Sequence, residues 1–126
     1  MGRKAACINN RFFRERVRSY LLALGEAFKN HPAVIGWQLD NEIGLTVDHI
    51  CYCDSCEGAW NSWLKGLHGG APEFNRRLKL ASWGMGVDSL DDVPQPRVVM
   101  ESQTVALPAL VLASLHFRRD AILDFL

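Results

Sequence analysis

The chain has 126 residues, enough for one domain with a modest core, and its 14 basic residues balance its 14 acidic ones. A net charge of zero provides no field that would draw the chain to nucleic acid or to an anionic membrane surface. Apolar residues make up 48% of the sequence, yet no apolar run reaches the roughly 18 residues of a membrane span. The composition predicts a globular protein and excludes a disordered one.

The first predicted helix covers residues 12–30, because apolar residues recur there at spacings of three and four. Its apolar stripe consists of Phe13, Val17, Leu21, Leu24 and Phe28. His31-Pro32 is expected to stop it, since proline disfavours helix in the residue before it. The apolar run 33–39 follows and is typical of a strand buried on both faces, as in parallel sheets covered by helices. A helix, a tight turn and a buried strand form half of an α/β repeat, so the predicted fold class is α/β.

Three further helices are expected: residues 57–67, a segment that starts near Pro72, and the tail 108–126. The apolar side of the second helix would carry Trp60, Trp63, Leu64 and Leu67. The segment near Pro72 would continue through Phe74, Leu78 and Leu80, and the core positions of the tail would be Leu112, Leu115, Ile122 and Phe125. Only one convincing buried strand is visible, and such a strand needs a neighbour for its backbone hydrogen bonds. The sequence therefore predicts part of a larger sheet protein.

Cys51, Cys53 and Cys56 form a C-x-C-x-x-C motif, and Cys7 stands alone far upstream. Four thiolates suit a tetrahedral zinc ion and leave no position for water, so this zinc would be structural. The N-terminal residues lack the apolar core of a secretory signal, which predicts a reducing, cytoplasmic location where metal binding outranks disulfides. Buried thiols and two disulfides are the alternatives, and His49 is an alternative fourth ligand to Cys7.

Asp40-Asn41-Glu42 follows directly on the predicted strand, at the edge where catalytic groups project in α/β barrels. Glu42 as a general acid would suit glycoside chemistry, because protonating a glycosidic oxygen requires a carboxyl group with a raised pKa. Asn41 could donate a hydrogen bond to a sugar hydroxyl beside it. The alternative interpretation is an acidic turn that caps the next element.

The string HPAVIGWQLDNEIG followed by CYCDSC, with GRKAAC upstream and an FN…SW segment downstream, resembles the family 42 glycoside hydrolases, β-galactosidases built on a TIM barrel. The resemblance spans essentially the whole chain and implies that Glu42 closes the fourth barrel strand as the acid/base catalyst. It implies substrate binding by Arg3 and Asn41, and by Trp83 at the sugar pocket of a neighbouring subunit in a homotrimer. It also implies a structural zinc ion on Cys7, Cys51, Cys53 and Cys56.

A complete barrel takes roughly 250 residues. Residues 1–126 are therefore expected to form a partial (β/α)8 TIM barrel, consisting of the fourth strand, flanking helices and a zinc-binding excursion. Matched to the family, the chain ends before the strand that carries the nucleophile, and Glu73, Glu101 and Asp120 are expected to be surface charges. The intact enzyme would hydrolyse terminal β-galactosides by a retaining mechanism, whereas the isolated chain is expected to be inactive.

The alternative function is a non-catalytic zinc-binding interaction module or the inactive remnant of a truncated gene. Exposure of apolar side chains separates the two hypotheses. A barrel fragment should expose Val34, Ile35 and Leu39, which would lack their neighbouring strands. An independent module is expected to be a folded, soluble and monodisperse chain that binds a protein partner.

Overall fold

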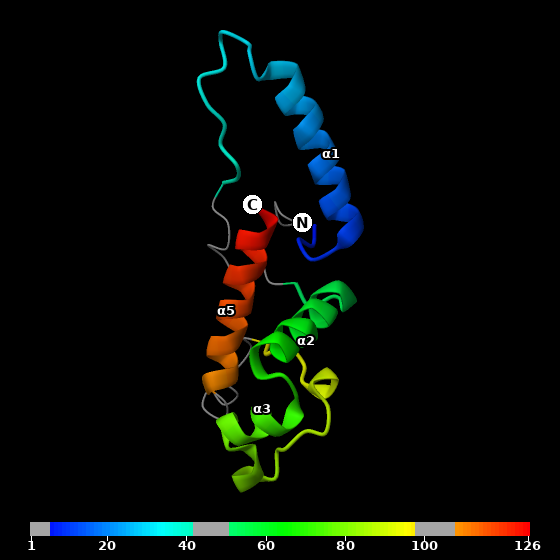
Figure 1. The fold of residues 1–126 in the computed structure, drawn as a ribbon, viewed down its shortest axis with the longest axis vertical. Coiled ribbons are helices and arrows are strands. Elements are labelled where there is room, and N and C mark those ends of the chain that lie inside the picture. The colour runs from blue at the N-terminus through cyan, green and yellow to red at the C-terminus, as the bar shows by residue number, and fades with distance from the viewer. Residues whose placement is uncertain (1–5, 42–50, 98–107) are drawn as a thin grey trace. The chain divides into compact units, whose positions relative to one another are not determined.

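The structure is a computed structural model of the chain and describes residues 6–41, 51–97 and 108–126. Its elements in chain order are the helices α1 (Arg11–Phe28), α2 (Asp54–His68) and α3 (Ala71–Leu78), the 3-10 helices η2 (Leu80–Trp83) and η3 (Leu90–Asp92), and helix α5 (Pro108–Phe125) (Figure 1). None of the described residues belongs to a β-strand. None of the described helices combines the length and apolar composition needed to cross a lipid bilayer.

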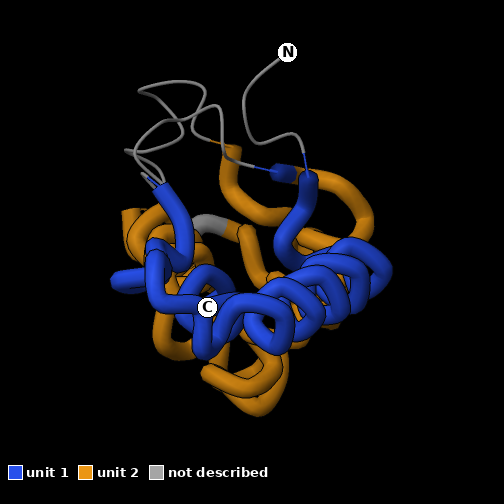
Figure 2. The backbone as a smooth tube through the Cα atoms, turned by 90° about the horizontal axis from the view of Figure 1, so that it is seen from above, with its two compact units in different colours: residues 1–51, 121–126 blue, residues 52–120 orange. Residues whose placement is uncertain are grey.

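The chain divides into two compact units (Figure 2). Unit 1 consists of residues 1–51 and 121–126, and unit 2 consists of residues 52–120. Helix α5 runs from unit 2 into unit 1, so that its last residues belong to the same unit as α1.

Helix α1 confirms the first predicted helix. Asn10 is its N-cap, and its side-chain oxygen accepts a hydrogen bond from the backbone N–H of Phe13 at 3.0 Å. This bond satisfies one of the first-turn donors that have no partner within the helix. At the other end, His31 N–H donates to the carbonyl of Phe28 as the chain turns. The predicted stop before Pro32 is thus confirmed.

Unit 1 has no buried side chain among its described residues. Its clearest side-chain packing joins α1 to the end of α5. There Phe13 and Phe125 stack with their ring centroids 6.0 Å apart, and Arg14 forms a 2.8 Å ion pair with Asp124. The apolar stripe predicted for α1 is present, but Leu21 and Phe28 within it remain exposed.

Residues 33–39 do not form the buried strand that the sequence predicts. The segment is extended without β-pairing, and Ile35, Trp37 and Leu39 are 102%, 53% and 75% exposed. The physical reason is the missing sheet: a strand is stabilised by hydrogen bonds to a neighbouring strand, and no other described segment supplies one. The exposure expected of a barrel fragment is confirmed for Ile35 and Leu39, while Val34 is partly covered.

Unit 2 has a core built by α2, α3, η3 and α5. Helix α2 ends at Gly69, whose left-handed conformation (φ 73°) is the usual one after a helix and is accessible to glycine without a steric penalty. The largest buried side chains of unit 2 are Trp60, Leu64, Phe74, Leu90 and Phe117.

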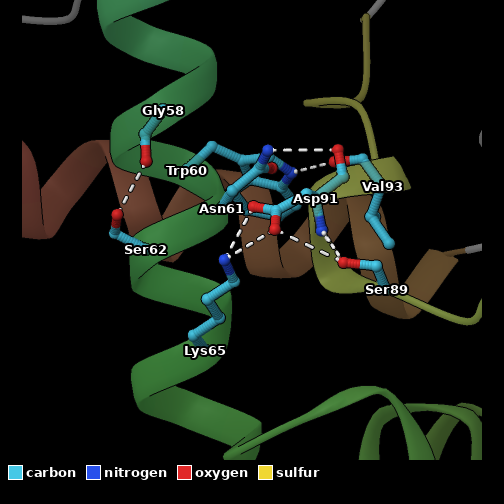
Figure 3. Close-up of polar contacts among 8 residues, drawn as sticks. All are labelled: Gly58, Trp60, Asn61, Ser62, Lys65, Ser89, Asp91 and Val93. Atoms are coloured by element: carbon cyan, nitrogen blue, oxygen red, sulfur yellow. Dashed lines mark hydrogen bonds and ion pairs between the residues drawn. The ribbon is translucent and has the colours of Figure 1, made fainter.

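Helix η3 is fixed to α2 by polar contacts (Figure 3). The indole N–H of Trp60 donates to the carbonyl of Val93 at 3.0 Å, and Lys65 forms a 2.7 Å ion pair with Asp91. Asn61 donates to the carbonyl of Asp91 at 3.3 Å. Residues 89–93 therefore lie along α2 although they are distant from it in sequence.

The three predicted later helices are confirmed, but two of the core positions predicted for the last helix are wrong. Leu112 and Leu115 are about half exposed, and the buried residues of α5 are Ser114 and Phe117. Helix α5 carries apolar residues around much of its circumference, so periodicity does not select one face. The face is selected by the rings of α2, against which Phe117 packs edge-on.

Candidate functional site

The structure brings four cysteines together. The sulfur atoms of Cys7, Cys51, Cys53 and Cys56 all lie within 4.8 Å of one another. In a tetrahedral zinc site with Zn–S bonds of about 2.3 Å, the sulfurs are separated by about 3.8 Å. Four thiolates are a donor set that could hold a metal ion of this kind.

The start of α2 positions two of these cysteines. Cys53 is the N-cap residue, and its carbonyl accepts hydrogen bonds from the N–H groups of Cys56 and Glu57 at 2.8 and 3.0 Å. Cys53 and Cys56 are therefore one helical turn apart. A helix N-terminus favours negative charge, which suits thiolate ligands at this position.

Cys7 is fixed by the turn that precedes α1. Its carbonyl accepts a hydrogen bond from the N–H of Asn10 at 3.0 Å, and Arg14 donates to the carbonyl of Ile8 at 2.6 Å. These bonds tie residues 7–10 to the first turns of α1. Sequence spacing alone left His49 as a competing ligand, and His49 lies outside the described residues.

Asn41 ends the extended segment that was predicted as a strand. Gln38 donates from its side-chain nitrogen to the carbonyl of Asp40 at 2.9 Å and to the side-chain oxygen of Asn41 at 3.2 Å. The backbone N–H of Asn41 donates to the carboxylate of Asp40 at 2.6 Å. Because Oδ1 of Asn41 accepts from Gln38, its donor Nδ2 is turned to the opposite side of the amide.

The structure does not test the other predicted catalytic and substrate-binding residues. Glu42 and Arg3 lie outside the described residues. Trp83 is the last residue of η2 and is followed by Gly84 in the left-handed conformation. A role of these residues in a sugar site stays a prediction.

Two of the three carboxylates expected to be surface charges, Glu73 and Asp120, are paired with neighbouring side chains. Hydrogen bonds from Arg76 and Arg77 hold the pKa of Glu73 at about 2, below its ordinary value of 4.5. Asp120 accepts a 2.9 Å hydrogen bond from the indole of Trp63, which together with Arg119 lowers the pKa of its carboxyl. Both side chains remain partly exposed and are paired at the surface, which confirms that they are surface charges. The third carboxylate, Glu101, lies outside the described residues.

Sequence reasoning missed the role of residues 93–97, which Pro94 and Pro96 mark as a loop. In the structure this segment contacts α2 and the cysteine motif: Gln95 N–H donates to Glu57 at 2.9 Å and Tyr52 donates to the carbonyl of Pro96 at 3.3 Å. Val93 and Gln95 are buried. Pro94 between them is exposed, and this alternation of buried and exposed residues is visible only in the structure.

Comparison with known proteins gives a consistent result. The sequence model of glycoside hydrolase family 42, described as β-galactosidase, matches residues 1–126. β-Galactosidase BgaP of Planococcus sp. is 30% identical over 126 residues, which cover 98% of this chain and 18% of that protein. β-Galactosidase YesZ of Bacillus subtilis is 34% identical over 95 residues, which cover 75% of this chain and 14% of that protein.

Solved structures of β-galactosidases also match this chain. The polyextremophilic β-galactosidase from the Antarctic haloarchaeon Halorubrum lacusprofundi matches with a TM-score of 0.84 and 28% identity, over 99% of this chain and 18% of that one. The β-galactosidase from the psychrophilic Marinomonas ef1 matches with a TM-score of 0.80 and 25% identity, over 94% of this chain and 18% of that one. The chain thus spans less than a fifth of the relatives that it matches.

Proposed function

The chain belongs to the glycoside hydrolase family 42 β-galactosidases, and we propose that residues 1–126 are the part of the catalytic barrel that carries the acid/base glutamate, Glu42. The observation that carries the proposal is the family match over the whole sequence, which includes Asn41-Glu42 and all four cysteines. Because the chain spans 18% of BgaP, we place the nucleophile outside this sequence. Retaining hydrolysis needs that second carboxylate about 5 Å from the acid.

In the proposed mechanism Glu42 acts twice. Its carboxyl group donates a proton to the glycosidic oxygen while the nucleophile attacks the anomeric carbon and the glycosidic bond breaks. Its carboxylate then takes a proton from the water that attacks the galactosyl-enzyme, which releases galactose with its configuration retained. Asn41 and Arg3 would hold the galactose, and the bond from Gln38 would aim Nδ2 of Asn41 at a hydroxyl oxygen. Trp83 would contribute to the sugar pocket of a neighbouring subunit in a homotrimer.

The exposed apolar segment supports a barrel fragment. Ile35, Trp37 and Leu39 are exposed close together, and such apolar patches are rare on complete soluble domains. Flanking barrel strands would cover these side chains and complete their backbone hydrogen bonds. The alternative, a non-catalytic zinc-binding module, is favoured by the core of unit 2 but leaves the exposed segment unexplained.

We assign a structural zinc ion to Cys7, Cys51, Cys53 and Cys56. Four thiolates complete the coordination of the ion and leave no position for water or substrate, so the ion would contribute to folding. A reducing compartment such as the cytoplasm would keep these thiols available for the metal.

The acid/base role is tested by Glu42→Gln in the intact enzyme. We expect kcat on lactose to fall by about 100- to 10,000-fold, the usual contribution of general acid–base catalysis. An aryl galactoside with a good leaving group should still galactosylate the enzyme, because it needs no acid. Azide, which needs no base, should then restore turnover and give β-galactosyl azide.

The matched control is Glu26→Gln, which removes an exposed carboxylate of α1 that is paired with Lys29. It should leave all rates unchanged. Normal lactose hydrolysis by Glu42→Gln, or an α-linked azide product, would refute the assignment. The isolated chain should hydrolyse no β-galactoside, and hydrolysis that disappears with Glu42→Gln would show that this sequence contains its own nucleophile.

A further inference from the structure

Tyr52 lies between two of the four cysteines and is held by residues far away in the sequence. Its hydroxyl donates to the carbonyl of Pro96 and accepts from a guanidinium nitrogen of Arg118, both at 3.3 Å. The guanidinium carbons of Arg97 and Arg118 lie 5.4 and 5.9 Å from the centroid of its ring. Two hydrogen-bond and two cation–π contacts thus converge on one partly buried side chain.

These contacts fix the backbone from which two ligand side chains project. The sulfurs of Cys51 and Cys53 converge with those of Cys7 and Cys56, while the side chain of Tyr52 is engaged with residues 96–97 and with α5. Successive side chains of extended backbone point in alternating directions, and Cys53 has the extended values φ −76° and ψ 168°. Because Cys51 and Cys53 are the direct neighbours of Tyr52, contacts that hold Tyr52 also restrict the backbone of both cysteines.

The segment that holds Tyr52 is itself attached to the helix that carries Cys56. Val93 accepts from the indole of Trp60 at 3.0 Å, and the N–H of Gln95 donates to Glu57 at 2.9 Å. Both Trp60 and Glu57 belong to α2, which starts at the motif. A closed set of contacts thus runs from Tyr52 through residues 93–97 to α2 and back to the motif.

We propose that Tyr52 is a positioning residue for the metal site: its anchorage to Pro96, Arg97 and Arg118 holds Cys51 and Cys53 at the separation from Cys56 that a tetrahedral ion requires. The proposal rests on the zinc site assigned above. Residues that orient the metal ligands change the affinity for the metal although they do not contact it themselves. Tyr52 would act in this way through the backbone of its two neighbours.

The test uses the 126-residue chain with Co²⁺ and Zn²⁺ as probes. Tyr52→Ala removes all four contacts, and Tyr52→Phe removes only the hydrogen bonds. The matched control is Tyr20→Ala, which removes the other tyrosine of the chain, a 65% exposed residue of α1. Visible absorption of the Co²⁺ form reports tetrahedral thiolate coordination, and competition with a chromophoric chelator gives the Kd for Zn²⁺.

We expect Tyr52→Ala to raise the Kd for Zn²⁺ by about 10- to 100-fold, the usual effect of losing an outer-shell partner. The Co²⁺ absorption band should also weaken or shift. Tyr52→Phe should bind with intermediate affinity, because it keeps the ring and its contacts with the two guanidinium groups. Tyr20→Ala should bind like the unchanged chain. Far-UV circular dichroism checks that the variants keep their helices. If Tyr52→Ala loses them, Arg118→Gln replaces it in the comparison and should show the same fall in affinity.

The outcomes separate this inference from the assignments on which it rests. If the unchanged chain binds neither ion, the metal site is wrong and the role of Tyr52 falls with it. If the unchanged chain binds metal and the folded Tyr52 or Arg118 variant binds as tightly, only the positioning role is overturned. An equal loss in Tyr20→Ala overturns it as well. None of these results depends on galactosidase activity, which the Glu42 variants test separately.

Discussion

Replacing Phe117 by alanine tests whether packing of α5 against α2 stabilises unit 2. Phe117 is 4% exposed, and its ring lies edge-on to those of Trp60 and Trp63, with centroid distances of 5.5 and 6.0 Å. The two indoles stack on each other at 5.7 Å. Phe117 thus completes a three-ring cluster, with one ring from α5 and two from α2.

The expected loss of stability is large. Replacing a buried phenylalanine by alanine costs about 3–5 kcal/mol, because transfer free energy is lost and a cavity remains. Domains of this kind are stable by about 5–15 kcal/mol, so the variant should be close to unfolding. Leu115, in the same helix, is 49% exposed. Full burial of a leucine contributes about 1.5–3 kcal/mol, so Leu115→Ala should cost roughly 1 kcal/mol.

Urea unfolding followed by far-UV circular dichroism compares the two variants at the same metal content. With a slope of about 2 kcal/mol per molar urea, the midpoint should fall by about 2 M for Phe117→Ala and about 0.5 M for Leu115→Ala. Equal shifts, or a larger shift for Leu115→Ala, would refute the packing described here. They would instead favour Leu115 as a core residue of α5, as the sequence analysis expected.

Two further predictions concern the metal and pH. Removing metal with a chelator should lower the thermal midpoint of the chain, because an ion bound only by the native state stabilises it by about 4 kcal/mol at a thousand times its Kd. Scanning calorimetry with and without zinc measures the difference, Cys56→Ser should abolish it, and identical midpoints would contradict a structural ion. Bonds from Arg76 and Arg77 hold the pKa of Glu73 at about 2 instead of 4.5, so its contribution to stability is present above pH 4.5 and is lost as pH falls toward 2. Glu73→Gln should reduce the pH dependence of the thermal midpoint in that range, whereas an unchanged slope, or an equal reduction in Glu26→Gln, would contradict this assignment.

The helices could be predicted because their signals are local. Apolar spacing gave α1 and α2 to within a few residues, and Pro32 and Gly69 marked their ends. Burial was harder to predict, as Leu115 and Phe117 show. Which of them faces the core depends on the indoles of α2, and no pattern within α5 contains that information.

The candidate metal site likewise contains residues that local sequence signals identify and residues that they do not. Cys51, Cys53 and Cys56 are recognisable from spacing, since a turn and the start of a helix determine how they converge. The approach of Cys7 depends on a contact across more than forty residues, and only the resemblance to a family indicated it. The contacts of Tyr52 with Pro96 and Arg118 span 44 and 66 residues and left no signal in the sequence.

Residues 33–39 show why a sequence can favour a strand that its own chain does not form. Their β-branched and aromatic residues suit a pleated, buried surface. A strand, however, obtains its backbone hydrogen bonds from a neighbour, whereas a helix makes them internally. The helical core of unit 2 is therefore specified by this sequence, whereas the segment that ends at Asn41 has no neighbouring strand among the described residues.

The proposed zinc site and the proposed catalytic site at Glu42 differ in how much they depend on neighbouring strands. All four residues proposed to bind zinc are among the described residues, and their sulfurs lie within 4.8 Å of one another. The orientation of Glu42 depends on the segment before it, whose side chains Ile35 and Leu39 are uncovered. The isolated chain should therefore bind metal with its cysteines and still fail to hydrolyse galactosides, because a barrel positions a carboxylate only when neighbouring strands fix the strand that carries it.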